Sequence, residues 1–134
     1  MTLMSLCSAP NVFKAGAALA PVSDWALYDS HYTERYMGLP QDNPEEYLRS
    51  GILPHLNKLD SPLLLMHGMA DDNVLFTNST LIMSELQKLG KHFELMTYPG
   101  AKHSMQETHV SIHRFTTILN FFSLHLKTKT TEQN

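Results

Sequence analysis

The chain has 134 residues, 43% hydrophobic and 17% charged, which is the composition of a folded protein with a core. Its formal net charge is -3 with 10 lysines and arginines, which excludes a basic surface for nucleic acid. The longest apolar runs, such as residues 63–66, are far too short to span a membrane. The single cysteine, Cys7, lies in an apolar stretch, which predicts a buried structural thiol and no disulfide within the chain.

The first 20 residues predict a helix and then a strand. Residues 1–7 have a helical pattern but no capping residue before them. Natural domains seldom begin inside a helix, because the first turn leaves amide groups without partners, so we expect Met1 to be an internal residue of a longer protein. Pro10 and Asn11 predict the end of this helix, and the small residues 15–20 predict a short buried strand.

The next segment predicts helices with an aromatic face. Four aromatic residues follow one another at intervals of three or four, which places their rings along one side of a helix: Trp25, Tyr28, Tyr32 and Tyr36. Asn43 and Pro44, followed by two glutamates, predict the start of another helix, since they supply an N-cap, a first-turn proline and early acids.

The second half of the chain alternates strands and helices. The apolar run after Pro62 predicts a buried parallel strand that ends at Gly68. The pattern then predicts a helix over 76–89, with Ile82, Leu86 and Leu89 on one side. A strand over 93–98 and a last amphipathic helix are expected after it. The apolar residues expected on the buried face of that last helix are Ile112, Phe115, Ile118, Phe122 and Leu126. Such alternation predicts an α/β fold, a parallel sheet whose strands are flanked by helices.

Polar residues follow two of these strands. Asp71 and Asp72 come after the first, and His103 comes after the next. An acid and then a histidine at the carboxyl ends of parallel strands form the second half of the hydrolase order Ser, Asp, His. There the imidazole takes the serine proton, and the carboxylate holds the imidazole tautomer. On pattern alone, an alternative stays open in which Asp71 caps a turn and His103 is a loop residue.

Three other histidines have weaker functional interpretations. His109 and His113 are four apart on a helix, but Val110 stands where a zinc peptidase needs glutamate, so we expect both to face solvent. His67 ends a buried strand and is expected to be a hydrogen-bonded structural residue rather than a second base.

Two segments resemble the dipeptidyl peptidase IV branch of the prolyl oligopeptidase family. Residues 20–38 contain the specific motif Tyr-Thr-Glu-Arg-Tyr-Met-Gly, and residues 67–74, His-Gly-Met-Ala-Asp-Asp-Asn-Val, are similar to the aspartate loop of that family. The resemblance implies that residues 1–126 are the C-terminal part of an α/β-hydrolase peptidase domain that lacks the nucleophile elbow, followed by a polar tail over 127–134. It places the nucleophile, in a Gly-x-Ser-x-Gly-Gly-Tyr turn, just before this segment, and the 134 residues contain no Gly-x-Ser-x-Gly.

The same resemblance implies a role for each site residue. Asp71, third after Gly68, matches the triad acid and His103 the triad base. Asp72 is expected at the approach to the following helix, where unpaired amides stabilise a carboxylate. The resemblance assigns substrate binding to Tyr28, Tyr32, Asn73, Trp25, Val22, Tyr36 and Val74.

The two tyrosines at 28 and 32 would hold the penultimate proline of a substrate, and Asn73 would bind a backbone carbonyl. Plain core packing is the alternative for the aromatic face. Ser104 stands where many bacterial relatives have glycine after the triad histidine, which we do not interpret as loss of activity. The resemblance implies no metal or organic cofactor.

The expected function is that of a serine peptidase which, when intact, releases N-terminal Xaa-Pro or Xaa-Ala dipeptides from peptides through an acyl-enzyme. The 134 residues alone are expected to be inactive. The alternatives are an acyl-peptide hydrolase or prolyl endopeptidase of the same superfamily, or a catalytically dead fragment. The resemblance also implies a propeller domain and a serine-bearing half as partners within one protein. It is compatible with a homodimer and with a periplasmic or extracellular location.

Overall fold

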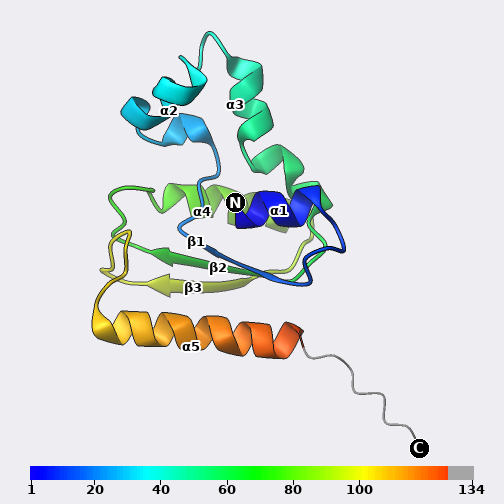
Figure 1. Ribbon diagram of the computed structural model, residues 1–134, viewed down its shortest axis with the longest axis vertical. Helices are drawn as coiled ribbons and strands as arrows, with labels where there is room; N and C mark the ends of the chain where they lie inside the picture. The colour runs from blue at the N-terminus through cyan, green and yellow to red at the C-terminus, as the bar shows by residue number, and fades with distance from the viewer. Residues whose placement is uncertain (127–134) are drawn as a thin grey trace, which may run out of the picture.

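A computed structural model describes residues 1–126 and has a three-stranded parallel sheet at its centre (Figure 1). The strands are β1 (Gly16–Leu19), β2 (Leu63–Gly68) and β3 (Glu94–Tyr98), in that spatial order. All six residues of β2 are buried, because it pairs with a strand on each side and has helices on both faces. The predicted α/β class, with parallel strands flanked by helices, is confirmed, and these strands begin and end within a few residues of the predicted positions.

One face of the sheet is covered by three helical segments: α1 (Thr2–Ser8), η2 (Leu53–Lys58) and α4 (Thr77–Lys88). Leu63 and Leu65 of β2 point into this layer and pack with Ile82 and Leu86 of α4, whereas Leu89 is 38% exposed. Cys7 is buried in the same core, and this burial raises the pKa of its thiol. At the end of α4, Gly90 adopts a φ of +65°, and a side chain there would meet open space.

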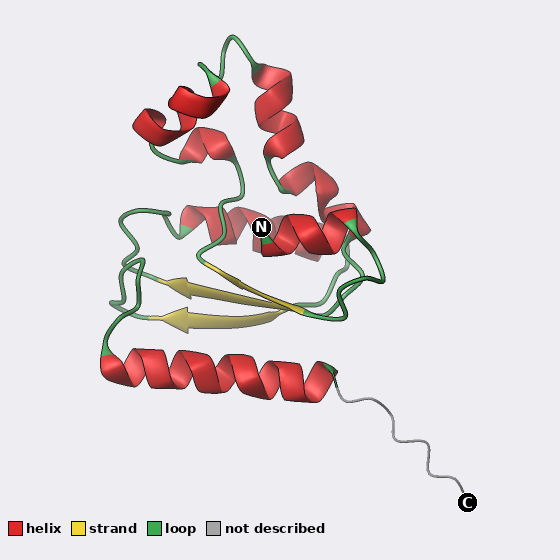
Figure 2. Cartoon of the chain, viewed as in Figure 1, coloured by secondary structure: helices red, strands yellow, loops and turns green. Residues whose placement is uncertain are grey.

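The other face is covered by α5 (Thr108–His125), the long helix drawn below the sheet in Figure 2. Leu64 and Met66 of β2 pack against Val110 and Phe121 of this helix. The predicted buried face was partly wrong: Ile118 and Phe122 are partly buried, but the other three residues, Ile112, Phe115 and Leu126, are more than half exposed. Apolar residues occur on more than one side of α5, so the sequence pattern favoured the wrong stripe.

A small helical lobe is inserted between β1 and β2 and lies at the top of Figure 1. It contains η1 (Trp25–Leu27), α2 (Ser30–Met37) and α3 (Pro44–Ser50). The predicted start of α3 at Pro44 is confirmed. The aromatic residues do not share one helix, because Asp24 caps η1 and Asp29 caps α2, each by accepting a backbone N–H.

None of the helices in residues 1–126 combines the length and the apolar content needed to cross a membrane. The predicted polar tail, 127–134, lies outside the described residues.

Candidate active site

The loops that follow β2 and β3 lie side by side, because these strands are neighbours and Gly68 is in register with Tyr98. Backbone hydrogen bonds join the two loops: the N–H of Met69 donates to the carbonyl of Tyr98, and that of Ala70 donates to Ala101. The approach is close, since a Cβ on Gly68 would lie 2.4 Å from the carbonyl oxygen of Ala101. Glycine is therefore required at this position, and the two loops form one connected structure.

Asp71 and His103 meet across these loops. The Nδ1 atom of His103 lies 2.8 Å from Oδ2 of Asp71. The carboxylate is fully buried, and its Oδ1 accepts the backbone N–H groups of Asn73 and Val74 at 2.9 and 3.0 Å. The histidine side chain is 42% exposed. The structure thus has a buried, oriented carboxylate bonded to one nitrogen of a half-exposed imidazole.

The environment of Asp71 favours its charged form. Burial by itself acts to raise the pKa of this carboxyl group, but hydrogen bonds from His103 and from the amides of Asn73 and Val74 outweigh it. The pKa of Asp71 is therefore lower than its ordinary value. A charged carboxylate at this position keeps the proton of His103 on Nδ1, which leaves Nε2 able to accept one.

A second histidine also contacts this carboxylate. Nε2 of His67 lies 3.1 Å from Oδ2 of Asp71 and 2.8 Å from the carbonyl oxygen of Val74, and its Nδ1 lies 2.7 Å from Oγ of Ser79. The His67 side chain is completely buried, as expected of a hydrogen-bonded residue at the end of β2. Its contact with Asp71 was not predicted, since a spacing of four across a strand and a loop has no fixed geometry.

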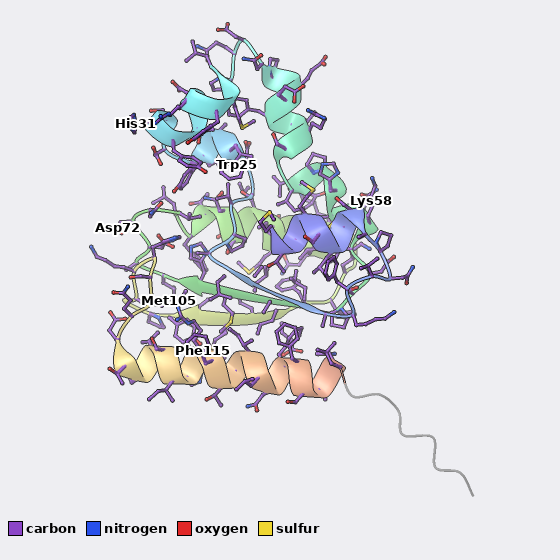
Figure 3. All side chains as sticks on the ribbon, viewed as in Figure 1. Trp25, His31, Lys58, Asp72, Met105 and Phe115 are labelled. Carbon is purple, nitrogen blue, oxygen red and sulfur yellow. The ribbon has the colours of Figure 1, made fainter. Side chains whose placement is uncertain are left out.

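The neighbouring acid, Asp72, has a different environment. Its carboxylate accepts a hydrogen bond from Nζ of Lys102 at 2.7 Å, and both side chains are largely exposed (labelled Asp72 in Figure 3). This bond lowers the pKa of Asp72. The expectation that Asp72 stabilises the start of the following helix was wrong, because α4 begins at Thr77 and has no side-chain cap.

The predicted substrate-binding aromatics form a ladder of rings on the helical lobe. Neighbouring rings are 6.0, 5.6 and 5.1 Å apart between centroids, in the order Trp25, Tyr28, Tyr32 and Tyr36. A cavity of about 290 Å³ lies beside them and is lined by Trp25, Tyr32, Thr33, Tyr36 and Met37. Tyr32 and Tyr36 are 50% and 69% exposed, so plain core packing does not describe them.

The other predicted residues fall into two groups. Val22 lines a cavity of about 480 Å³ with Trp25 and the end of β1. Asn73 is exposed and Val74 is buried, both on the loop with Asp71.

A buried link joins the lobe to α4: the backbone N–H and the hydroxyl of Ser23 both donate to Oδ1 of Asn78, at 2.9 and 3.0 Å. Sequence reasoning missed Asn78, whose side chain gave no functional signal.

The two histidines on the last helix, His109 and His113, are both exposed, as expected. His113 also lies with its Nδ1 3.2 Å from the hydroxyl of Tyr98, and its ring meets that tyrosine edge to face. Neither histidine belongs to the cluster around Asp71 and His103.

Comparisons with known proteins agree with the fold. A protein-family model described as "Prolyl oligopeptidase family" matches residues 1–129. Dipeptidyl peptidase 4 of Bos taurus is 40% identical over 124 residues, which is 90% of this chain and 16% of that protein. Dipeptidyl peptidase family member 1 of Caenorhabditis elegans is 47% identical over 107 residues, 78% of this chain and 13% of that protein.

Solved structures of similar proteins give the same result. The crystal structure of Porphyromonas gingivalis dipeptidyl peptidase 4 superposes with a TM-score of 0.89 and 38% sequence identity. The match covers 92% of this chain and 18% of that one. The chain therefore spans less than a fifth of the length of these relatives.

Proposed function

Because this chain belongs to the prolyl oligopeptidase family of serine peptidases, we propose that it supplies the acid and the base of a serine peptidase active site. In this proposal residues 1–126 are the C-terminal part of an α/β-hydrolase domain, and the nucleophilic serine belongs to another part of the same protein. The observation that carries the proposal is the 2.8 Å contact between His103 Nδ1 and the buried Asp71 carboxylate. This contact fixes the tautomer that a general base needs.

The proposed chemistry divides the work between these two residues. His103 takes the proton of the serine hydroxyl on Nε2 while the serine oxygen attacks the scissile carbonyl. Asp71 stabilises the imidazolium that forms, and it stays ionised because its pKa is lowered. His103 then gives the proton to the leaving amine, and an acyl-enzyme remains. Water, deprotonated by the same imidazole, attacks the acyl group and releases the peptide acid and the serine.

For the substrate, we propose peptides from which an N-terminal Xaa-Pro or Xaa-Ala dipeptide is released. The named relatives are dipeptidyl peptidases. The ring ladder from Trp25 to Tyr36 supports this proposal, since the exposed rings of Tyr32 and Tyr36 and the adjacent cavity suit an apolar pyrrolidine ring. Asn73 is exposed next to Asp71, where its amide can donate to a substrate carbonyl.

The test is an assay of the full-length protein that contains this chain. We expect it to release nitroaniline from Gly-Pro-p-nitroanilide, and we expect His103→Ala to abolish the release at an unchanged melting temperature. A His103→Ala protein with the wild-type rate would contradict the proposed role of the histidine. Cleavage of an acetyl-alanine reporter, or of a reporter blocked at its amino terminus before Gly-Pro, would identify an acyl-peptide hydrolase or a prolyl endopeptidase instead.

A further inference from the structure

We infer that His67 is a positioning residue for this reaction, one that holds the Asp71 carboxylate in place through a buried hydrogen bond. The inference rests on the proposed function, because it assumes that Asp71 acts on His103. It goes further by giving a role to a side chain that sequence reasoning classed as structural only.

The contacts of His67 determine where its proton lies. Nε2 faces two acceptors, the carboxylate of Asp71 at 3.1 Å and the carbonyl of Val74 at 2.8 Å, so Nε2 carries a hydrogen and shares it between them. Nδ1 lies 2.7 Å from the hydroxyl of Ser79. With the proton on Nε2, the ring nitrogen accepts this bond and the serine donates it. The bond to Ser79 is compatible with this tautomer, which the two acceptors facing Nε2 already select.

The oxygen that His67 contacts is the one that His103 uses. Oδ2 of Asp71 lies within hydrogen-bond distance of both histidines, and Oδ1 accepts two backbone amides. A carboxylate offers about four acceptor positions, so this one is fully occupied. Rotation of the carboxylate would break several of these bonds at once. Without His67, Oδ2 would keep a single donor, on a half-exposed side chain.

His67 is itself held firmly, which a positioning residue requires. Its side chain is completely buried, at the end of the central strand β2. The ring meets Phe76 edge to face, with centroids 5.3 Å apart, and bonds to Ser79 in the first turn of α4. It thus connects the sheet, the helix and the loop that carries Asp71, at the end of the sheet where the labelled Asp72 lies in Figure 3.

Two amide variants separate positioning from packing. A glutamine at position 67 can place its amide N–H near the position of Nε2, facing Asp71. An asparagine is shorter, and its amide reaches only the position of Nδ1, facing Ser79. Both keep a polar, partly satisfied side chain in the same cavity. If His67 only stabilises the fold, the two variants should differ in melting temperature and not in turnover.

The experiment measures kcat and KM of the full-length protein on Gly-Pro-p-nitroanilide, below the melting temperature of every variant. We expect His67→Asn to lower kcat by about 10-fold or more at an unchanged KM, by analogy with the loss of a hydrogen-bond partner behind a metal-binding histidine. We expect His67→Gln to recover most of that loss. Ser79→Ala, which removes the bond on the far side of the ring, should stay within a few-fold of wild type. If His67→Asn does not fold, His67→Met replaces it with the same expectation.

Equal kcat values for the asparagine and glutamine variants would overturn the inference, as would a Ser79→Ala loss as large as that of His67→Asn. Asp71→Asn and His103→Ala are measured in the same series. If these two keep wild-type turnover, the proposed function is wrong. If they lose it while His67→Asn does not, the proposed function stands and only the role of His67 is wrong.

Discussion

Asp72 and Lys102 form an exposed ion pair of 2.7 Å beside the part-buried hydrogen bond between their neighbours, Asp71 and His103. Two side-chain contacts, one part-buried and one at the surface, therefore add to the backbone hydrogen bonds that join the two loops. Two adjacent carboxylates thus have separate partners, which allows their roles to be separated by matched substitutions.

The first prediction separates these two acids. In the full-length protein, Asp71→Asn should lower turnover by about 10⁴-fold, because the amide favours the wrong tautomer of the histidine. Asp72→Asn should stay close to wild type, because it removes only a solvent-screened pair at the surface. Steady-state kinetics on a Gly-Pro reporter and melting curves for both variants test this. The opposite ranking would assign the triad acid to Asp72.

The second prediction concerns stability in acid. The pKa of Asp71 is lowered in the folded protein, so its charge contributes stability above the unfolded value of about 3.9. That contribution is lost as the pH falls through the lower folded value. Urea unfolding of the wild type between pH 5 and 2 should therefore show a loss that Asp71→Asn lacks. An equally steep acid loss in Asp71→Asn would contradict the lowered pKa.

The third prediction concerns the aromatic ladder. Tyr32→Ala should reduce kcat/KM for Xaa-Pro reporters and reduce the preference for proline over leucine, because the ring contacts Tyr28 and Tyr36 and lines the cavity. The melting temperature should change little, since Tyr32 is half exposed. Leu39→Ala, at a similarly exposed apolar position in the same lobe, is the control. A folded Tyr32→Ala protein that keeps its proline preference would show that the pocket lies elsewhere.

The fourth prediction concerns the link between the lobe and α4. Asn78→Ala should destabilise the protein by roughly 1–3 kcal/mol, because it leaves the buried N–H and hydroxyl of Ser23 without an acceptor. Thr80→Ala removes an exposed hydroxyl from the same turn of the helix and should have little effect. Denaturant melts of the two variants give the comparison. Equal stability for both would mean that the Ser23–Asn78 bonds contribute nothing net.

The fifth prediction concerns the 134-residue chain by itself. It should neither cleave a Gly-Pro reporter nor react with a fluorophosphonate, because its sequence contains no Gly-x-Ser-x-Gly turn to supply an activated serine. Full-length protein assayed in parallel is the positive control. Covalent labelling of the short chain at any serine, with turnover, would show that a different nucleophile serves this histidine.

The fold was largely predictable where one pattern has one explanation. The unbroken apolar run of β2 can be buried on both sides only in the middle of a sheet, and that is its position. The buried face of α5 was not predictable in the same way, since Ile112 and Phe115 form a stripe as regular as that of Val110 and Phe121. The stripe that faces the sheet is determined by how the helix packs on β2 and β3. The sequence of the helix alone does not specify this packing.

The candidate site, like the fold, was predictable only in part. Strand order brings Asp71 and His103 to one edge, so their contact followed from the sequence, although their catalytic role stays a prediction. The partners of Asp72 and His67 did not follow. Lys102 has a long flexible side chain that can reach many positions, and the direction of the His67 ring depends on the packing of α4 against β2.

The two loops are joined by backbone hydrogen bonds from Met69 and Ala70 to Tyr98 and Ala101, and Gly68 allows their close approach. This arrangement determines where the chain can accept inserted residues. The distance between acid and base depends on neighbouring strand ends and not on the length of the crossover between them. Gly90 lies on that crossover, where it leads into the opposite end of β3 and faces open space. An inserted peptide tag or a small fused domain should therefore be tolerated at this turn, whereas a single extra residue between Gly68 and Asp71 would displace the carboxylate from the imidazole.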